Sequence, residues 1–476
     1  MPVPPHLPTL PIGQDTRTPQ GSRTALSRRG FLALGGQAAA LTALSACSQG
    51  SATRREPDAI TLWAAFDRNS DRKYFEQHFV TNFNKDHDFR VRLTIKDGES
   101  LERLQQTAIA SGQGPDIVFT SGPSYALEYI TAGKLAPLDS YATKDKWADK
   151  LQTWAYDSGK VDGKLYSIPN SFETMIGFVN KEVLAKYNWK APANRSDFEG
   201  LCAEAKGKGL MPVLAGSAEW KPATEWFVSV IFNHYSGPDA VYSALQGETP
   251  WTDPIFVDAI TLLNGYFQKG WFGGGVKEYF TNRFDALNTK FAKGGIAYDI
   301  VGSWAFGDMR SFFDGKTGAG PDVWDWAPLP AFRQGIPHDL YTLSVGGTYS
   351  INADSKNPAK AAEYLNWLIS DRKREANAVA AVAFQPYPLN YSESDFPAKT
   401  DERIRRLYVD MAAAKAFGYV TWTFWPPKSD VYIYQEMDKV LTGKITPKDY
   451  CAGLDKVFQE ERKQNKVPPV PKPAGA

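Results

Sequence analysis

Hydrophobic and polar residues follow two alternating patterns in the first part of the chain. A two-residue period runs over 89–95, and short apolar runs cover 60–65 and 116–120, so each of these segments predicts a β-strand. After each strand the apolar residues recur every three or four positions, which is the period of a helix. These helical segments are 67–84, 100–108 and 125–131. The strict alternation of strands and helices predicts a parallel sheet covered by helices.

Capping and turn residues predict where some elements begin and end. Ser100 is the expected N-cap of the second helix, and Asn357 before Pro358 predicts a later helix start. The segment 161–164 predicts a turn between two short strands, and the Pro-rich tail from Val467 predicts a disordered end. The later helix is expected to bury Ala361, Tyr364, Leu365 and Leu368.

Two loops of the predicted sheet are candidate ligand contacts, because ligands of open α/β sheets bind beyond the carboxyl ends of the strands. The loop after the first strand contains Trp63 and Asp67. The loop after the third strand contains Thr120 and Ser121. The pattern therefore marks these four residues as candidates for a binding site.

The N-terminal segment has the order of an export signal rather than of a folded element. Arg28 and Arg29 lie in Ser-Arg-Arg-Gly-Phe-Leu, which resembles the twin-arginine export motif. The apolar run after this motif is shorter than the roughly 20 residues that span a bilayer. It ends in Leu-Ser-Ala-Cys, which resembles a bacterial lipobox, so Cys47 is the expected lipidation site. We therefore expect residues 1–46 to be a twin-arginine lipoprotein signal peptide and residues 47–57 to be a polar tether.

Composition narrows the class of protein. A chain of 476 residues is too long for one ordinary core and predicts two large lobes. The hydrophobic fraction of 43% and the charged fraction of 22% are those of a soluble globular protein. A net charge of +1 without basic clusters argues against nucleic acid as a partner. The chain is not a disulfide scaffold, and whether Cys202 and Cys451 pair stays open.

Short motifs occur along the chain in an order that resembles bacterial extracellular solute-binding protein family 1, the sugar-type binding lipoproteins of ABC importers, which includes the maltose-binding protein. The motifs are Gly-Gln-Gly-Pro-Asp-Ile-Val at 112–118, Ala-Gly-Lys-Leu-Ala-Pro-Leu-Asp at 132–139, Asp-Gly-Lys-Leu-Tyr-Ser-Ile-Pro at 162–169, Phe-Ala-Lys-Gly-Gly-Ile-Ala at 291–297, Gly-Ser-Trp at 302–304, Gly-Gly at 346–347 and Ser-Lys-Asn-Pro at 355–358. Each motif is weak alone. Their order and spacing carry the resemblance, which covers most of residues 58–460.

This resemblance implies an α/β fold of two lobes, each a mainly parallel sheet flanked by helices, with a ligand cleft between the lobes. The chain is then expected to cross between the lobes near 168–170, near 344–350 and near residue 400. The first lobe would hold 58–168 and 349–400, the second lobe would hold 169–348 and 401–460, and 461–476 would form a tail. Such lobes close on a ligand by hinge motion.

A carbohydrate site needs aromatic faces against the C–H groups of the sugar and polar side chains around its hydroxyls. Trp304 comes after two small residues at a position where the family has a stacking aromatic residue, and a core tryptophan is the alternative. The aromatic segment 419–427 supplies Trp422 and Trp425, either as a cleft wall or as a plug on the core. Trp220 and Trp226 flank a similar family position, and Tyr432 falls near another family stacking position.

Carboxylates supply the polar part of the expected site. Glu173 matches the ligand-binding carboxylate of the family, and a plain surface glutamate is the alternative. Glu219 and Asp67 are weaker candidates, and Gly347 completes the predicted set of ligand-binding residues.

The resemblance implies a non-catalytic protein that captures a mono- or oligosaccharide and delivers it to the membrane permeases of an ABC importer. Thr120 and Ser121 stand where maltose-type relatives have a tryptophan and an aspartate, so maltodextrin itself is not implied. The alternative cargo is a glycerophosphodiester or another polyol derivative, whose phosphate Arg68 or Arg310 would bind.

Two remote alternatives come from other classes of protein. One is a lipoprotein adhesin or sensor partner that binds without transport. The other is a glycosidase that pairs Glu173 with Glu219 or Asp67, but no hydrolase motif or metal-ligand spacing supports an enzyme. We therefore expect no cofactor and no metal site, and a monomer held by its lipid at the outer face of the cytoplasmic membrane, in a periplasm or at the cell surface.

Overall fold

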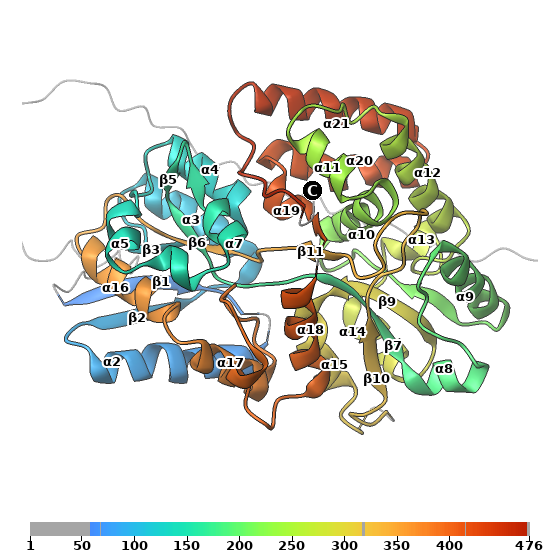
Figure 1. Ribbon diagram of the computed structural model, residues 1–476, viewed down its shortest axis with the longest axis horizontal. Helices are drawn as coiled ribbons and strands as arrows, with labels where there is room; N and C mark the ends of the chain where they lie inside the picture. Colours follow the sequence, from blue (N-terminus) through green and yellow to red (C-terminus); the bar gives the residue numbers. More distant parts are fainter. Residues whose placement is uncertain (1–57, 67, 317–318, 415, 474–476) are drawn as a thin grey trace, which may run out of the picture. The chain divides into compact units, whose positions relative to one another are not determined.

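The computed structural model describes residues 58–66, 68–316, 319–414 and 416–473 (Figure 1). The predicted signal peptide with Arg28 and Arg29, Cys47, the tether and Asp67 lie outside the described residues. The described residues contain two larger sheets, and we call the parts of the chain built on them the first lobe and the second lobe.

The first lobe is built on a five-stranded sheet with the order β2-β1-β3-β12-β6. Its strands are β1 (Ala59–Ala64), β2 (Arg90–Ile95), β3 (Ile117–Thr120), β6 (Ser167–Pro169) and β12 (Thr348–Ile351). β1 pairs in parallel with β2 and β3, whereas β12 pairs antiparallel with both β3 and β6. The sheet is therefore mixed, because the chain returns from the second lobe in the opposite direction and inserts β12 between two earlier strands.

Helices around this sheet close the core of the first lobe. They are α1 (Asn69–Phe75), α2 (Asn82–Asp86), α3 (Gly98–Ala110), α4 (Pro123–Thr131), α5 (Asp139–Lys144), α6 (Trp147–Lys150), α7 (Thr153–Ser158), α16 (Pro358–Leu368) and α17 (Arg372–Val382). A π-helical segment, η1 (Glu76–Thr81), joins α1 to α2. The core packs Ile60 and Leu62 of β1 against Phe79 and Phe83 of this helical stretch and against Leu365 of α16.

The second lobe is built on a four-stranded sheet with the order β10-β7-β9-β8. Its strands are β7 (Met175–Asn180), β8 (Met211–Leu214), β9 (Ile296–Gly302) and β10 (Trp324–Ala327). β8 and β9 pair in parallel, whereas β7 pairs antiparallel with both β9 and β10. A separate two-stranded parallel sheet joins β11 (Tyr341–Leu343) to β13 (Phe417–Tyr419), and β4 (Lys160–Val161) forms a hairpin with β5 (Lys164–Leu165).

Most of the remaining helices pack on the second sheet or on one another. They are α8 (Lys181–Tyr187), α9 (Arg195–Gly207), α10 (Thr224–Ile231), α11 (Pro238–Leu245), α12 (Pro254–Gln268), α13 (Val276–Tyr279), α14 (Phe284–Ala292), α15 (Phe306–Phe312), α18 (Glu402–Ala413), α19 (Thr421–Phe424), α20 (Pro427–Leu441) and α21 (Pro447–Arg462). Short 3-10 and π turns complete them: η2 (Lys221–Ala223), η3 (Phe232–Ser236), η4 (Ser303–Ala305) and η5 (Glu393–Asp395).

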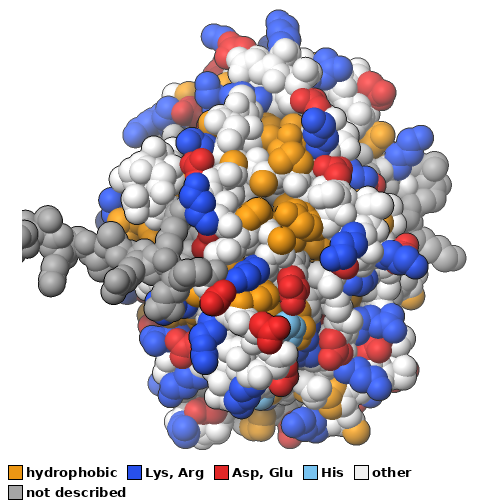
Figure 2. Space-filling view, turned by 90° about the vertical axis from the view of Figure 1, so that its left-hand side faces the viewer, with side chains coloured by type: hydrophobic (Ala, Val, Ile, Leu, Met, Phe, Trp, Pro, Cys, Tyr) orange, Lys and Arg blue, Asp and Glu red, His pale blue; other side chains and the backbone are white. Residues whose placement is uncertain are grey.

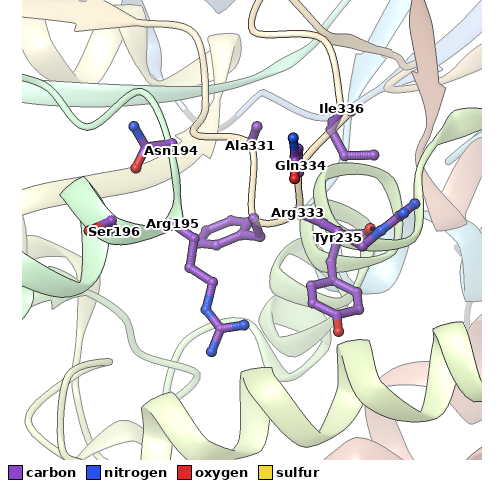
Figure 3. A pocket seen from close by; sticks show the side chains of 10 residues that line it. Asn194, Arg195, Ser196, Tyr235, Ala331, Arg333, Gln334 and Ile336 are labelled. Carbon is purple, nitrogen blue, oxygen red and sulfur yellow. Dashed lines mark hydrogen bonds between the residues drawn. The ribbon is translucent and has the colours of Figure 1, made fainter.

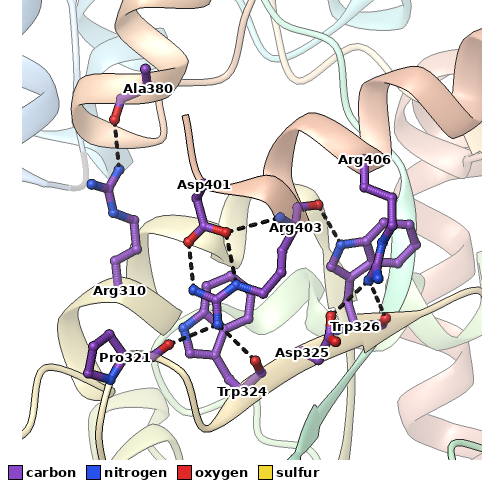
Figure 4. A network of polar contacts seen from close by, with 9 residues as sticks. All are labelled: Arg310, Pro321, Trp324, Asp325, Trp326, Ala380, Asp401, Arg403 and Arg406. Carbon is purple, nitrogen blue, oxygen red and sulfur yellow. Dashed lines mark hydrogen bonds and ion pairs between the residues drawn. The ribbon is translucent and has the colours of Figure 1, made fainter. Parts of the chain in front are cut away.

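Stacked arginines fasten α18 to the edge strand β10 (Figure 4). The Cζ atom of Arg403 lies 3.4 Å from the centre of the Trp324 ring, and the same guanidinium donates to the carbonyl oxygens of Pro321 and Trp324 at 2.8 Å. Arg406 lies over the Trp326 ring in the same way, at 4.5 Å. Because a planar guanidinium both stacks and donates in its plane, these two contacts fix the helix on the sheet.

The sequence patterns predicted most elements of the first lobe correctly. The three strands, the helices that come after them and the 161–164 hairpin are confirmed, and all four residues expected on the buried face of α16 are buried. One boundary is wrong: the N-cap of α3 is Asp97, whose side chain accepts from the amide of Ser100 at 3.3 Å. The two-lobed α/β fold is confirmed, but both sheets are mixed rather than mainly parallel.

The tail is ordered as far as it is described, so the prediction of disorder from Val467 is wrong for that part. Val467 and Val470 pack against the core of the second lobe, and the Tyr419 hydroxyl donates to the carbonyl oxygen of Pro471 at 2.7 Å. Proline without an amide donor still offers a carbonyl acceptor and an apolar ring, and both are sufficient for docking on a surface.

Charged side chains of both signs are interspersed on the face shown in Figure 2, around a short strip of hydrophobic ones. This mixture agrees with the net charge of +1. Within the described ranges no helix combines the length and the apolar character that crossing a membrane requires, and no group of three or more His, Cys, Asp or Glu side chains is placed to hold a metal ion. Cys202 and Cys451 are both buried and free, which answers the open question about their pairing.

Candidate functional site

Both marked loops of the first lobe contact the second lobe. Arg68, after β1, donates through Nη1 to the carbonyl oxygen of Trp304 at 3.1 Å. Gly122, after β3, has a φ of 146°, and a Cβ there would lie 2.6 Å from the carbonyl oxygen of Trp422, so this close approach needs glycine. Ser124 donates to the carbonyl oxygen of Trp425. The loops beyond the strand ends therefore meet one aromatic region of the second lobe, as expected for open α/β sheets.

Three tryptophans from separate elements form this aromatic region, which we call the tryptophan cluster: Trp226 of α10, Trp304 of η4 and Trp422 of α19. The ring centres of Trp226 and Trp304 are 5.4 Å apart, and those of Trp304 and Trp422 are 6.0 Å apart with the planes at 71°. Trp226 also stacks on Phe284 at 5.7 Å. Trp226 and Trp304 remain partly exposed, so the cluster presents aromatic surface to solvent.

Glu173 connects to the tryptophan cluster through a serine. The Trp422 indole donates to Ser344 Oγ at 2.9 Å, and Ser344 Oγ lies 3.4 Å from Glu173 Oε2. Ser171 Oγ lies 3.3 Å from Glu173 Oε1, and the backbone of residue 173 pairs with that of Ser344. Only 5% of Glu173 is exposed, so it is not the plain surface glutamate of the alternative interpretation. Its carboxylate sits among hydroxyl groups next to aromatic rings, which is the chemistry that a sugar site needs.

The remaining candidates of the first lobe are held mainly by the protein itself. Thr120 is buried, and its hydroxyl contacts Gly122 O at 2.9 Å and Thr348 Oγ1 at 2.6 Å. The Ser121 amide donates to Glu102 Oε1 at 2.9 Å. The Trp63 ring is partly exposed and carries the Lys96 ammonium 4.6 Å from its centre.

Glu219 and Gly347 are explained by contacts within the protein. Glu219 forms an ion pair with Arg283 at 2.6 Å and accepts from the Phe284 amide at 2.6 Å, so its carboxylate holds the start of α14. Gly347 is buried, and a Cβ there would meet the Phe119 ring at 2.5 Å. By contrast, Trp220 is 45% exposed and belongs to the same loop as Glu219.

Trp425 and Tyr432 are corrections to the predicted site. Trp425 is fully buried in the core of the second lobe, where its ring packs on Trp251 at 5.3 Å and stacks with Phe232 at 6.5 Å. Tyr432 points its hydroxyl into the packing of α20 on α21 and donates to the Tyr450 carbonyl at 3.1 Å. Both rings take part in the packing of the second lobe: Trp425 lies directly before the two prolines at the start of α20, and Tyr432 lies within that helix.

Two members of the site were absent from the predicted set. Trp226 was noted in the sequence only as flanking a family position, and its packing on Trp304 is what brings it into the tryptophan cluster. Ser344 carries no local signal, because its role comes from the contact with Glu173, 171 positions away.

A buried carboxyl pair lies behind the aromatic region. Glu225 of α10 and Asp430 of α20 are both buried, and burial raises the pKa of Asp430 to about 6 and that of Glu225 well above its usual value, with the neighbouring Asp430 as the second cause. Tyr125, from α4 of the first lobe, donates to Asp430 Oδ2 at 3.0 Å, and Thr421 donates to Glu225 Oε2 at 3.2 Å. Burial and the neighbouring carboxyl therefore favour the protonated form in this pair, as expected when two carboxyls share a buried site.

The two arginines considered for a phosphate make their contacts to protein groups. Arg68 pairs with Asp71 through Nη2 at 2.7 Å and Nε at 3.2 Å, in addition to the Trp304 contact. Arg310 donates to the Ala380 carbonyl at 3.4 Å. The donors of Arg68 in particular are directed at the protein, which disfavours a phosphate at this position.

A cavity of about 540 Å³ on the second lobe is separate from the tryptophan cluster and from the predicted site residues (Figure 3). It is lined by Asn194, Arg195, Ser196, Tyr235, Ala331, Phe332, Arg333, Gln334, Gly335 and Ile336. Arg333 donates to the carbonyl oxygens of Tyr235 and Ser236, and Arg195 pairs with Glu199. None of the predicted site residues lines it, so we place the candidate site at the tryptophan cluster, where polar and aromatic groups from both lobes converge.

Comparison with known proteins bears on the family and the fold of this chain. Residues 67–375 match the family model described as bacterial extracellular solute-binding protein. A probable sugar-binding periplasmic protein of Mesorhizobium japonicum is 22% identical over 355 residues, which cover 74% of this chain and 81% of that protein. A galactooligosaccharide-binding protein of Bacillus subtilis is 23% identical over 318 residues, covering 64% of this chain and 70% of that protein.

Among solved structures, a chitin oligosaccharide binding protein superposes with a TM-score of 0.71 at 20% identity, covering 84% of this chain and 98% of the other. At this identity the likeness shows the fold alone, which is the two-lobed α/β fold predicted from the motifs. The family is extracellular and binds solutes without catalysis, in agreement with the predicted export and non-enzymatic function. From the matched length, which is more than half of the chain, we conclude that this protein belongs to the bacterial extracellular solute-binding protein family.

Proposed function

We propose that the protein captures a carbohydrate between its lobes and delivers it to the permease subunits of an ABC importer. The observation that carries the proposal is the tryptophan cluster joined to Glu173 through Ser344. Aromatic faces suit the C–H groups of a sugar ring, and a carboxylate among serine hydroxyls suits its OH groups. The Mesorhizobium and Bacillus relatives, a probable sugar-binding periplasmic protein and a galactooligosaccharide-binding protein, support the same class of ligand.

A thermal-shift screen tests this proposal. The panel holds glucose, galactose, maltotriose, a galacto-oligosaccharide, a chito-oligosaccharide and glycerophosphocholine. A bound compound at 100 times its Kd stabilises the folded state by about 2.7 kcal/mol, which raises Tm measurably. We expect at least one carbohydrate to raise Tm. A shift with glycerophosphocholine alone would favour the phosphodiester alternative, which the engaged donors of Arg68 disfavour.

Glu173 provides a sharper test at the level of one side chain. Glu173→Gln keeps the shape and removes the charge, so we expect affinity for the carbohydrate found in the screen to fall by roughly 1–3 kcal/mol. Glu182→Gln is the matched control, because Glu182 is an exposed residue in the first turn of α8. Unchanged affinity in Glu173→Gln would remove this residue from the site.

Import and motion are part of the same proposal. We take the chain to cross between the lobes near 168–170, near 344–350 and near residue 400, and the lobes to close on the ligand by hinge motion. Small-angle scattering should then show a smaller radius of gyration at saturating ligand. Genes for two membrane permeases beside the gene of this protein would support import, whereas their absence would favour a binding lipoprotein without transport.

Lipid anchoring rests on the sequence motif at Cys47. Cys47→Ser should release the protein from membranes or leave the precursor uncleaved, because the thiol carries the lipid. Replacing both Arg28 and Arg29 by lysine should block export by the twin-arginine route. A Cys47→Ser protein that fractionates and migrates like the wild type would contradict the anchor.

A further inference from the structure

Arg68 links three separate parts of the molecule. It comes after β1 in the first lobe, and Asp71 of α1 holds its guanidinium through two contacts, at 2.7 and 3.2 Å. The remaining terminal nitrogen donates to the carbonyl oxygen of Trp304 at 3.1 Å, and the Asp308 carboxylate lies 3.8 Å away. The side chain is 19% exposed, so solvent competes only weakly with these contacts. The guanidinium of Arg68 is held by Asp71 on one side and donates to the Trp304 carbonyl on the other. It therefore fixes the distance between α1 and the backbone of Trp304.

The second lobe provides a space that fits this guanidinium. Gly307, in the first turn of α15, lies so close to Arg68 that a Cβ at this position would overlap the guanidinium group. Gly307 has ordinary helical geometry, so its glycine is not required by the backbone. Because glycine costs a helix about 1 kcal/mol relative to alanine, the close approach of Arg68 is the reason that the structure offers for it.

The third part is the C-terminal end of α17, which packs against both lobes. Ala378 belongs to the core of the first lobe, whereas Val379 packs with residues of the second sheet. The carbonyl oxygen of Ala383 accepts from Arg68 Nη2 at 3.5 Å, and that of Ala380 accepts from Arg310 of α15 at 3.4 Å, a contact drawn in Figure 4. The last carbonyl groups of a helix lack intrahelical partners and carry partial negative charge, so they attract these two cations.

We propose that Arg68 is a positioning residue for ligand binding: it holds the backbone of Trp304 from the opposite lobe and thereby sets the orientation of the tryptophan cluster. The proposal rests on the function proposed above and adds to it a residue that acts without touching the ligand. The indole of Trp304 lies between those of Trp226 and Trp422, so a displacement of its backbone changes both ring contacts at once. A preorganised aromatic platform costs less to order when the ligand arrives, so affinity depends on the residue that holds it.

Four variants of the full chain test this role. Arg68→Ala removes the contact, and Arg68→Lys keeps a charge without the fork. Gly307→Ala leaves Arg68 in place chemically but displaces its guanidinium, which is the end of a flexible side chain. The fourth variant combines Arg68→Ala with Gly307→Ala. Arg72→Ala is the matched control, because Arg72 makes an exposed pair with Glu76 on the same stretch of chain.

Two readouts separate positioning from plain stability. The first is the affinity for the carbohydrate of the panel that binds the wild type most tightly. The second needs no ligand: it is the near-ultraviolet circular dichroism that the coupled indoles produce, taken as the difference between each protein and the same protein with Trp304→Phe.

We expect Arg68→Ala and Gly307→Ala each to weaken affinity about tenfold, equivalent to about 1.4 kcal/mol. Both should reduce the Trp304 difference spectrum, and the double variant should add nothing to Arg68→Ala alone. Gly307→Ala should melt no lower than the wild type, since alanine favours the helix. Arg68→Lys should fall between Arg68→Ala and the wild type, and Arg72→Ala should match the wild type.

The proposal is overturned if Arg68→Ala lowers Tm while affinity and the difference spectrum stay at wild-type values, or if Gly307→Ala has no effect on either readout. If no carbohydrate of the panel binds the wild type, the proposed function fails. The spectral readout then still decides whether Arg68 positions Trp304.

Discussion

Trp304 and Trp425 lie in segments that look alike in sequence and have different surroundings in the structure. Each is an aromatic residue next to small or rigid residues, outside any periodic pattern. Trp304 is partly exposed and lies between two other tryptophans, and its carbonyl oxygen accepts a hydrogen bond from Arg68 of the first lobe. Trp425 has no exposed surface and packs on Trp251 and Phe232. Aromatic density in a loop therefore does not distinguish a cleft wall from a core.

The difference arises from the position of each tryptophan relative to the next helix along the chain. Trp304 stands at the end of β9, on the edge where the loops of the first lobe arrive, and α15 begins only after it. Trp425 precedes two prolines that start α20, and that helix packs on α10 and α21. The ring of Trp425 therefore lies buried among these helices. Its carbonyl oxygen still accepts a hydrogen bond from Ser124 of the first lobe.

The largest effect expected is that of Trp425→Ala on stability. Removing a fully buried indole leaves a cavity, and such changes cost about 3–5 kcal/mol. Urea denaturation should show this loss in the free energy of unfolding, while the folded fraction keeps its affinity for carbohydrate. A variant that stays stable and binds weakly would reverse the distinction drawn between the two tryptophans.

Trp304→Ala should have the opposite profile. Truncating an aromatic residue that contacts a ligand typically costs about 2 kcal/mol or more of affinity. Because the ring is only partly buried, the loss of unfolding free energy should be smaller than for Trp425→Ala. Isothermal titration and urea denaturation of the two variants side by side check this, and a Trp304→Ala protein with normal affinity would place Trp304 with the core residues instead.

The pH dependence of stability should reflect the carboxyl pair near Trp425. Burial raises the pKa of Asp430 to about 6 in the folded protein, whereas an unfolded aspartate titrates near 3.9. The folded state therefore binds more protons between these values, so this group stabilises the fold most at low pH and loses that contribution as pH rises through about 6. The raised pKa of Glu225 extends the same trend to higher pH.

Asp430→Asn should flatten this part of the pH profile. Each pKa unit corresponds to about 1.4 kcal/mol, so we expect the unfolding free energy of the wild type, relative to the variant, to fall by about 2 kcal/mol between pH 4 and pH 7. The titratable groups that interact with the pair are Tyr125, Glu461, Tyr434, Tyr450 and Tyr279. Parallel pH profiles for the two proteins would show that the pair does not titrate as inferred.

The smallest effect expected is that of Trp220→Ala. Trp220 is 45% exposed, and substitutions at such surface positions usually change stability by less than about 0.5 kcal/mol. Its contribution to affinity should be below that of Trp304, because an exposed ring buries less surface against a ligand. A loss of affinity larger than that of Trp304→Ala would move the centre of the site towards the loop at Glu219.

The local pattern of hydrophobic and polar residues was sufficient to predict the strands and helices of the first lobe. It was not sufficient to predict how they assemble into a sheet. The two-residue period over 89–95 correctly predicted a strand, and the helical spacing of apolar residues correctly predicted α16. The place of β12 between β3 and β6 joins residues more than 170 positions apart, and no local property of Thr348–Ile351 encodes that pairing. The prediction of mainly parallel sheets failed for this reason.

The same division holds for the site. The rule about strand ends identified the loops at Arg68 and Gly122, which do reach the second lobe. It did not indicate that Glu219 is occupied by Arg283 and the Phe284 amide, or that Thr120 bonds to Thr348, because those partners become neighbours only in the folded chain. Ser344 was missed for the same physical reason, and Trp226 was noted only as flanking a family position.

The insertion of β12 also has a consequence for synthesis of the protein. Thr348 pairs with Thr120 and with Pro169 at the centre of the first sheet, so the ribosome has made most of the chain before that sheet can be completed. Until then the unpaired edges of β3 and β6 are open to wrong partners, a hazard that grows with the separation of paired strands. The nascent first lobe should therefore depend on chaperones until residue 351 has left the exit tunnel, and the N-terminal half alone should aggregate.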